Sequence, residues 1–362
     1  MLLGGYGMDK YITLTSAYKG RRVLVTGHTG FKGSWLCKWL QMLGAEVSGY
    51  SHQVLPGKNH FSLLELDMIS KFGDVRNLSF LDNWTKEFKP DLIFHLAAQP
   101  IVRLSYTYPV DTLTTNITGT INVLEAARSS GAKGIVVVTS DKCYKNKEWV
   151  WPYREEDHLG GNDPYSASKG CAEIVASSYY ESFLKEAGIQ VATARAGNVI
   201  GGGDWGEDRL IPDIIRAYTS DSTMTIRNPN SVRPWQYILD VLYGYLLIGK
   251  SILSRKDVSG AWNFGPTDTC SLSVDEIAKL ASTILRGPVI QYTGKLGPKE
   301  SLTLRLDSSK SRIILGWTPL FDIQDGVWET LDWYKDHHKN NIVSTERCIE
   351  DYIDQLEHLE EL

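Results

Sequence analysis

Short apolar runs alternate with longer helical patterns from Arg21 to about residue 197, and this alternation constrains the fold more than any other feature. The strand-like runs are RRVLVT, AEVSGY, PDLIFHLAA, KGIVVVTS and IQVATARAGNVIG. Most of them are apolar at nearly every position, which is typical of strands in a parallel sheet that helices cover on both faces. The sequence therefore predicts an α/β fold built on a Rossmann-type doubly wound parallel sheet.

After about residue 197 the pattern becomes irregular and richer in Gly, Pro, Arg and Trp, which predicts a smaller, interleaved C-terminal substrate-binding domain. The segment WQYILDVLYGYLLIG predicts a helix that returns to the first domain. We therefore expect a leader over residues 1–19, a first domain over 20–196 plus about 235–264, and a second domain over 197–234 plus about 265–362. The leader is expected to be loose and has neither signal-peptide nor transit-peptide character.

Charge and cysteine usage exclude several classes of protein. The chain carries 38 Lys and Arg against 43 Asp and Glu, a net charge of −5, which gives no general attraction to nucleic acid or to an anionic membrane. The five cysteines are widely spaced, without a C-x-x-C pair or a Cys/His cluster, so we expect a reduced, cytoplasmic protein without a metal site. No apolar segment approaches the roughly 18 residues of a membrane span.

The segment TGHTGFKG lies between the first predicted strand and the first predicted helix. A pyrophosphate needs close backbone approach and the free N–H groups of a helix N-terminus, and glycines at this spacing provide both. A tight turn without a ligand is the alternative. The candidate cofactor-binding residues here are Gly27, His28, Thr29, Gly30, Phe31, Lys32 and Gly33.

The exit of the second strand lacks the acidic residue that binds the ribose hydroxyls of NAD. Residues 50–53 read Tyr-Ser-His-Gln, and no Asp or Glu lies between Glu46 and Glu65. No arginine stands there to bind a 2′-phosphate either. NAD is the expected cofactor, and NADP stays open.

Two further segments are candidates for cofactor contacts. Asp74 and Val75 lie in a loop where the carboxylate could accept from the adenine amino group, although a solvated loop Asp explains the pattern equally well. Ala97, Ala98 and Gln99 follow a predicted strand, and the two small residues would let backbone pass close to a ribose.

Tyr165 and Lys169 are spaced i and i+4 in YSASK and share one face of a predicted helix. A phenol with an ordinary pKa of about 10 is a poor base at neutral pH. A nearby ammonium favours the phenolate and lowers that pKa. This pair is therefore the candidate catalytic base and its supporting cation.

The apolar strand between the glycine motif and Tyr165 ends in TSDKCY. Because ligands of open parallel sheets bind beyond the carboxyl ends of the strands, Ser140, Asp141 and Lys142 are expected beside Tyr165. A surface salt bridge between Asp141 and Lys142 is the alternative. The catalytic interpretation is favoured by the position at a strand end.

The segments TGHTGFKG, HLAAQPIVRLSY, TSDKCY, DPYSASKG, RAGNVIGGGDW and LGWTP resemble the extended short-chain dehydrogenase/reductase family over roughly residues 18–340. Within that family the chain is most similar to the nucleotide-sugar 4,6-dehydratases that act on CDP-glucose in deoxysugar biosynthesis. SVRPWQ is distinctive of the resemblance. The loop SHQVLPGKNHFSLL departs from it.

The resemblance implies roles for the candidate catalytic residues. Tyr165 would remove the proton of the sugar's 4-hydroxyl, to which Ser140 would hydrogen-bond, and Lys169 would hold the nicotinamide ribose. Asp141 would protonate the departing 6-hydroxyl, and Lys142 would remove the C5 proton. Hydride would pass from C4 to C6 through a tightly bound NAD. Asn116 resembles a helix-kinking Asn that supports the active-site geometry and is counted with the cofactor residues.

The resemblance also implies a nucleotide-sugar substrate and a homo-oligomer. The candidate substrate-binding residues are Arg103, Asn198, Arg209, Leu210, Arg233 and Glu300, although a surface charge explains Glu300 slightly better. Helices near 111–130 and 166–187 would form a dimer interface, giving a homodimer or homotetramer. A UDP- or dTDP-sugar dehydratase, an epimerase and a non-catalytic NAD-binding regulator stay open as alternatives.

Overall fold

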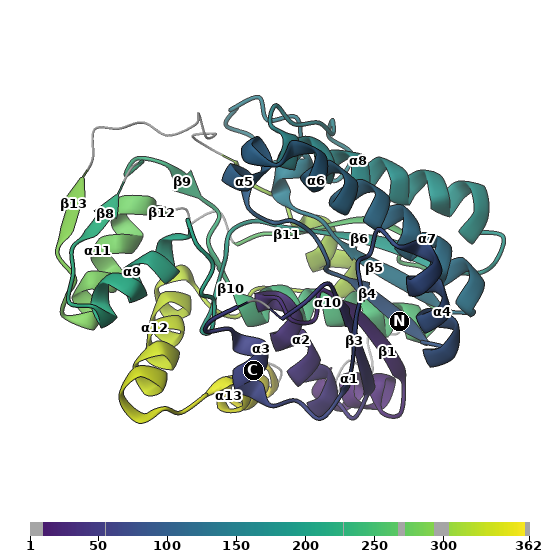
Figure 1. Ribbon diagram of the computed structural model, residues 1–362, viewed down its shortest axis with the longest axis horizontal. Coiled ribbons are helices and arrows are strands. Elements are labelled where there is room, and N and C mark those ends of the chain that lie inside the picture. The colour runs from purple at the N-terminus through teal and green to yellow at the C-terminus, as the bar shows by residue number, and fades with distance from the viewer. Residues whose placement is uncertain (1–9, 55, 227, 267–271, 293–303, 359–362) are drawn as a thin grey trace, which may run out of the picture.

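The computed structural model describes residues 10–54, 56–226, 228–266, 272–292 and 304–358, and a seven-stranded parallel sheet forms its centre (Figure 1). The strands are β1 (Arg22–Thr26), β2 (Glu46–Ser51), β3 (Ile69–Phe72), β4 (Leu92–His95), β5 (Gly134–Val138), β6 (Gln190–Ala196) and β11 (Gly260–Phe264). Their order is β11-β6-β5-β4-β1-β2-β3, and every neighbouring pair is parallel. The predicted doubly wound sheet is confirmed, with its order reversing between β1 and β4.

Helices cover both faces of this sheet (Figure 1). One face carries α4 (Leu78–Phe88), α7 (Gly119–Ser130) and α8 (Pro164–Tyr179), and the other carries α2 (Phe31–Met42) and α10 (Ile238–Leu253). Val23 and Val25 of β1 face the core under α2 and α10, and Leu24 between them faces the core under α7. Burial on both faces explains why the central strands β1, β4 and β5 are almost uniformly apolar, whereas the edge strand β3 is partly exposed.

The second half of the chain forms a smaller lobe of helices and two-stranded sheets, on the left in Figure 1. The helices are α9 (Leu210–Thr219), α11 (Val274–Leu285) and α12 (Ile323–Asn340). The strand pairs are β7 (Val199–Ile200) with β10 (Gln236–Tyr237), β8 (Met224–Ile226) with β13 (Ile290–Tyr292), and β9 (Val232–Arg233) with β12 (Leu272–Ser273). Between β10 and β11 the chain returns to the central sheet as α10, as the apolar segment near residues 235–249 predicts.

Short helical turns complete the fold and interrupt two predicted helices. They are α3 (His60–Leu64), α5 (Val102–Thr107), α6 (Pro109–Leu113), the 3₁₀ turn η2 (Asp141–Cys143) and the π-helical turns η1 (Thr114–Thr118), η3 (Tyr180–Leu184) and η4 (Ser311–Leu315). The long helix expected near 111–130 is interrupted by the π-helical turn η1, which contains Asn116. The helix α8 continues into the π-helical turn η3. Insertions of this kind frequently occur at functional sites.

The terminal helices correct two expectations about the ends of the chain. Residues Lys10–Tyr18 form α1, and the buried Tyr18 donates a hydrogen bond to the carbonyl of Leu246 at 2.9 Å. The expected loose leader is therefore wrong for residues 10–18, and residues 1–9 lie outside the described chain. The last helix, α13 (Thr345–His358), was expected in the second domain, but it packs against α1 and α2.

Within the described part of the chain, no helix combines the length and the apolar character needed to cross a membrane. The described cysteines, which are Cys37, Cys143, Cys171 and Cys348, are free thiols.

A buried carboxyl group joins α10 to the C-terminal segments. Asp240 Oδ1 accepts hydrogen bonds from the Leu320 N–H at 2.6 Å and the Tyr352 hydroxyl at 2.8 Å. Burial raises the pKa of Asp240 to about 7, against the effect of these hydrogen bonds. Because the unfolded chain releases this proton near pH ~4, the folded protein should lose stability as pH rises from about 4 to about 7.

Replacing Asp240 with Asn should remove this pH dependence, because the amide keeps an acceptor and cannot ionise. We expect D240N to be more stable than the wild type by roughly 2 kcal/mol at about pH 8 and to match it near pH ~4.5. Urea unfolding at both pH values measures the difference. An equal advantage at both pH values would contradict the assignment of the pH dependence to Asp240.

Candidate active site

The glycine motif forms the turn between β1 and α2. Gly27 has a φ of +75°, and a Cβ there would lie 2.6 Å from the Ala97 nitrogen. A Cβ on Gly33 would lie 2.2 Å from the Gly27 carbonyl oxygen. Gly30 is the N-cap residue of α2. Because glycine has no side chain, it provides no side-chain acceptor for the first N–H groups of the helix. The turn therefore fits a pyrophosphate, which would accept from these N–H groups.

We expect Gly33→Ala to weaken NADH binding by at least about tenfold, because the added methyl group forces α2 away from the turn. Fluorescence titration of NADH measures the dissociation constant. Gly326→Ala on α12 is the control, because a Cβ there has its nearest neighbour at 3.2 Å and that neighbour is a side-chain atom of Tyr237. Wild-type affinity in the Gly33→Ala variant would contradict the role of this turn.

The His28 side chain faces the sheet. Its Nδ1 is 2.9 Å from the Ser51 hydroxyl and its Nε2 is 3.1 Å from the Ser70 hydroxyl. Burial lowers the pKa of His28 to about 4, so the ring is neutral. The ring joins β2 and β3, and this leaves only the backbone of His28 for contact with a cofactor. Thr29 is likewise tied to this edge, because its hydroxyl donates to the Gln53 carbonyl at 2.9 Å.

Lys32 extends from α2 toward the catalytic groups. Its ammonium interacts with the charges of Lys169, Arg209, Asp141 and Asp204. Burial, with the nearby cations Lys169 and Arg209, lowers the pKa of Lys32 to about 8. Phe31 beside it points toward the lobe, where a Cβ on Gly201 would lie 3.1 Å from its ring.

Asp74 is a partly exposed loop residue whose carboxylate is paired with Arg76. Arg76 Nε lies 3.0 Å from Asp74 Oδ1, and Arg76 Nη2 lies 2.6 Å from Asp74 Oδ2. Arg76 also pairs with Asp111 at 2.6 Å. These hydrogen bonds lower the pKa of Asp74, so the carboxylate is ionised and already paired. Val75 is buried in the core against α7.

Asn116 clamps the end of β4 to α8. Its Oδ1 accepts from the Gln99 N–H at 2.8 Å, and its Nδ2 donates to the Gln99 carbonyl at 3.1 Å and to the Ser168 hydroxyl at 2.8 Å. Ala97 and Ala98 lie in the loop that this clamp holds, and the Ala97 N–H donates to Thr26 Oγ1 at 3.3 Å. The π-turn therefore places Asn116 where it orders both the loop and the helix of Tyr165.

Tyr165 and Lys169 lie on the buried face of α8. This helix begins at Asp163, whose carboxylate accepts from the Ser166 N–H at 2.9 Å. Tyr165 is 8% exposed and Lys169 is 6% exposed. Burial raises the pKa of Tyr165 to about 12, while a hydrogen bond with Ser140 acts against it, so the expectation that Lys169 lowers this pKa is wrong for the structure as it stands. Burial lowers the pKa of Lys169 to about 8, and its ammonium donates to the Val138 carbonyl at 3.2 Å.

Ser140, Asp141 and Lys142 follow β5 directly. The Ser140 hydroxyl donates to Asp141 Oδ1 at 2.8 Å and accepts from the Lys142 N–H at 3.2 Å. Asp141 is 3% exposed, and burial raises its pKa against the opposing charges of Lys142 and Arg233. A surface salt bridge is therefore the wrong interpretation of this segment. A buried carboxyl group with a raised pKa is suited to donating a proton.

Two of the three arginines of the predicted substrate site act on the catalytic groups, and the third is paired at the surface. Arg209 pairs with Asp204 at 2.7 Å, and its charge acts on Tyr165. Arg233 is buried and acts on Asp141. Arg103 pairs with Asp208 at 2.6 Å, which joins α5 to the segment before α9.

The other predicted substrate residues have less direct contacts. Leu210 is the first residue of α9, and the Asn198 carbonyl accepts from the Gln236 N–H at 3.0 Å. Glu300 lies outside the described residues. Asp204 was missed by sequence reasoning, because its position beside Arg209 and Lys32 depends on the turn that follows β7.

Sequence reasoning also missed a buried ion pair behind Lys169. Glu173 and Arg195 lie 2.8 Å apart, with side chains 2% and 4% exposed. Glu173 could have been found from the sequence, because it lies four residues after Lys169 and therefore on the same face of α8. Arg195 on β6 gave no signal beyond a charge within an apolar strand.

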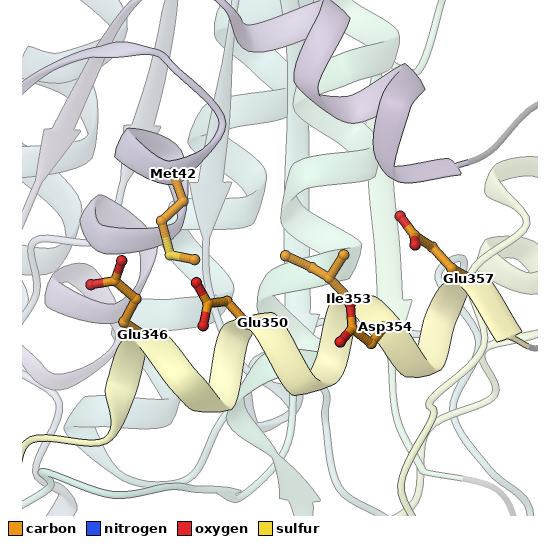
Figure 2. A pocket seen from close by; sticks show the side chains of 6 residues that line it. All are labelled: Met42, Glu346, Glu350, Ile353, Asp354 and Glu357. Carbon is orange, nitrogen blue, oxygen red and sulfur yellow. The ribbon is translucent and has the colours of Figure 1, made fainter.

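Two surface hollows of about 420 Å³ have linings that include none of the predicted site residues. One lies along α13 and is lined mainly by carboxylates, as Figure 2 shows. The other lies beside α9 and β8. Neither hollow contains the groups that could carry out the predicted chemistry.

Comparisons with known proteins agree with this geometry. The model of the NAD dependent epimerase/dehydratase family matches residues 23–264. The CDP-glucose 4,6-dehydratase of Salmonella typhimurium is 43% identical over 348 residues, which are 93% of this chain and 97% of that protein.

Solved structures show the same fold. An epimerase from Methanothermobacter thermautotrophicus superposes with a TM-score of 0.81 at 25% identity, covering 90% of this chain and 96% of that one. MoeE5 in complex with UDP-glucose and NAD superposes with a TM-score of 0.75 at 26% identity, covering 87% and 99%.

Proposed function

The chain belongs to the NAD dependent epimerase/dehydratase family, and from this premise we propose that it is a CDP-glucose 4,6-dehydratase. The reaction converts CDP-D-glucose to CDP-4-dehydro-6-deoxy-D-glucose and water. The observation that carries the proposal is that Ser140 and Asp141, at the carboxyl end of β5, interact with Tyr165, and that the charge of Lys142 acts on Asp141. The 43% identity to the Salmonella enzyme supports the choice of substrate.

NAD is the proposed cofactor. Gly27, Gly30 and Gly33 would admit its pyrophosphate, and Lys169 would hold the nicotinamide ribose. When bound, NAD supplies a hydride acceptor at C4 of the sugar and a hydride donor at C6. Because Asp74 is paired with Arg76 and the exit of β2 lacks an acidic residue, backbone groups near residues 51–53 would hold the adenosine ribose.

The chain's own residues would move the protons of the reaction. Tyr165 would accept the proton of the 4-hydroxyl after losing its own proton, and Ser140 would donate a hydrogen bond to the same oxygen. The resulting ketone acidifies the C5 proton, which Lys142 would remove after losing its own proton. Asp141 would donate its proton to the departing 6-hydroxyl. A plain dehydrogenase or an epimerase has no need of the last two groups.

The substrate would lie between the sheet and the smaller lobe. Arg233 would bind the diphosphate, where a guanidinium gives bidentate contacts. Arg209, Leu210 and Asn198 would frame the nucleotide and the sugar. We propose that the nucleotide-sugar lobe comprises residues 197–234 and about 265–344, with α13 belonging structurally to the sheet.

We also propose a cytoplasmic homo-oligomer. Ile174 on α8 is 58% exposed and Phe183 on η3 is 50% exposed. Such exposed apolar side chains would pack against the same helices of a second copy. Light scattering should give a dimer or tetramer, and charged residues at both positions should shift it toward the monomer.

Incubation with CDP-glucose, UDP-glucose and dTDP-glucose in parallel tests the proposed substrate. The alkaline absorbance of 4-keto-6-deoxysugars measures product. We expect turnover of CDP-glucose to exceed that of the other two by at least about tenfold. Preferred turnover of UDP- or dTDP-glucose would move the assignment to that nucleotide. NADH binding without turnover of any sugar would favour a non-catalytic regulator.

A further inference from the structure

Glu173 continues the catalytic face of α8. Tyr165, Lys169 and Glu173 are spaced at successive i+4 steps, so their side chains stack along one side of the helix. All three are buried, and Glu173 is 3% exposed. A carboxylate enclosed in this way needs both a countercharge and hydrogen-bond donors to remain ionised.

The structure provides both for Glu173. Its Oε1 accepts from the Thr139 hydroxyl, and its Oε2 accepts from the Thr193 hydroxyl at 2.6 Å and from Arg195 Nη2 at 2.8 Å. Thr139 immediately precedes Ser140. The carboxylate therefore joins α8, β6 and the end of β5 directly behind the catalytic groups.

Arg195 is held as firmly as its partner. Its Nη1 donates to the Tyr144 hydroxyl at 2.7 Å and to the Glu155 carbonyl at 2.8 Å. Its guanidinium carbon lies 4.9 Å from the centre of the Tyr144 ring. The Tyr144 hydroxyl in turn donates to Asn263 Oδ1 at 2.7 Å. Both terminal nitrogens of Arg195 are therefore hydrogen-bonded, which holds the guanidinium against Glu173.

The other titratable groups near Lys169 do not compensate its charge. Burial lowers the pKa of His95 on β4 to about 3, so the imidazole is neutral. Burial raises the pKa of the Cys143 thiol on η2 well above its usual range. Lys32 on α2 is a second cation. Of the described carboxylates, Glu173 is the one that raises the pKa of Lys169 against its burial.

We propose that Glu173, held by Arg195, is a positioning residue that keeps Lys169 charged in its buried site. Without Glu173, no described carboxylate would oppose the effect of burial on the Lys169 ammonium, which also lies near the cation Lys32, and the neutral amine would be favoured. A charged Lys169 donates stronger hydrogen bonds to a ribose than a neutral one. The inference rests on the proposed function, which assigns Lys169 to the nicotinamide ribose.

NADH titrations across pH test this inference without substrate. In the wild type, NADH binding should weaken by about fivefold as pH rises through the titration of Lys169, near pH ~8. Glu173→Gln should move this transition to lower pH by about one unit. Arg195→Gln should move it to higher pH, because the carboxylate then acts on Lys169 without opposition.

Two controls separate this effect from loss of structure. Lys169→Met should abolish the transition, which assigns it to Lys169 rather than to Lys32. Glu181→Gln removes an exposed carboxylate on η3 that pairs with Lys185, and it should leave the transition unchanged. A merely structural role of Glu173 would weaken binding equally at all pH values.

The transition is expected to move to lower pH in Glu173→Gln and to higher pH in Arg195→Gln. If one of the two variants fails to fold, the other still tests the inference. A transition that stays in place in Glu173→Gln or in Arg195→Gln would overturn the inference, as would a wild type whose NADH affinity does not change with pH. Because the titration needs no sugar, failure of CDP-glucose turnover would refute the proposed function and leave this result to be judged separately.

Discussion

Tyr165→Phe is expected to lower kcat with CDP-glucose by about 10³-fold. The reason is that the phenol accepts the proton of the 4-hydroxyl in the proposed mechanism. Phenylalanine keeps the ring and fills the same space in a buried site, so the melting temperature should change little. Steady-state turnover and thermal unfolding, measured on the same preparation, separate the two effects.

Tyr106→Phe is a matched control, because Tyr106 on α5 is exposed and touches none of the catalytic groups. It should retain wild-type kcat. Substantial turnover in Tyr165→Phe would show that another group accepts the proton, and a large loss of thermal stability would show that the hydroxyl is structural.

Lys142→Met is expected to stop the reaction after the first oxidation. Lys142 removes the C5 proton in the proposed mechanism, so elimination of water should slow by about 10³-fold while oxidation at C4 continues. The near-ultraviolet absorbance of reduced nicotinamide should then rise in a burst limited by the number of subunits. Wild-type protein should show no such accumulation, because the hydride returns to C6 in each turnover.

Lys145→Met gives the matched control, since Lys145 lies three residues further along and is exposed. It should turn over like the wild type without a burst. Loss of both the burst and the turnover in Lys142→Met would mean that Lys142 acts before elimination. Normal turnover in that variant would remove Lys142 from the mechanism.

The central strands could be predicted from the sequence because burial on both faces leaves a local apolar signature. The same holds for the glycine turn and for Tyr165 with Lys169, whose spacing is set within one helix. The edge strands β3 and β11 were missed as strands because they lack the apolar signature. His28 was different. It lies within the glycine motif, but its side chain is directed by Ser51 and Ser70, which reach it only through the pairing of β2 with its neighbours.

Long-range packing explains the other misses. The burial of α1 depends on Leu246, more than two hundred residues away in α10. The pair of Glu173 and Arg195 exists only because α8 crosses β6. Asp74 looked equally suited to adenine or to solvent, and its pairing with Arg76 required knowledge of the loop conformation. In each case both partners are in the sequence, but the sequence does not show that the fold brings them into contact.

CDP-glucose deuterated at C4 tests the central claim most directly. The account predicts that each product molecule carries the label at C6, transferred within the active site with no net consumption of NAD. Label released into free reduced cofactor would indicate a plain dehydrogenase. Label returned to C4 of an epimerised sugar would indicate an epimerase, and either result would contradict the assignment as a 4,6-dehydratase.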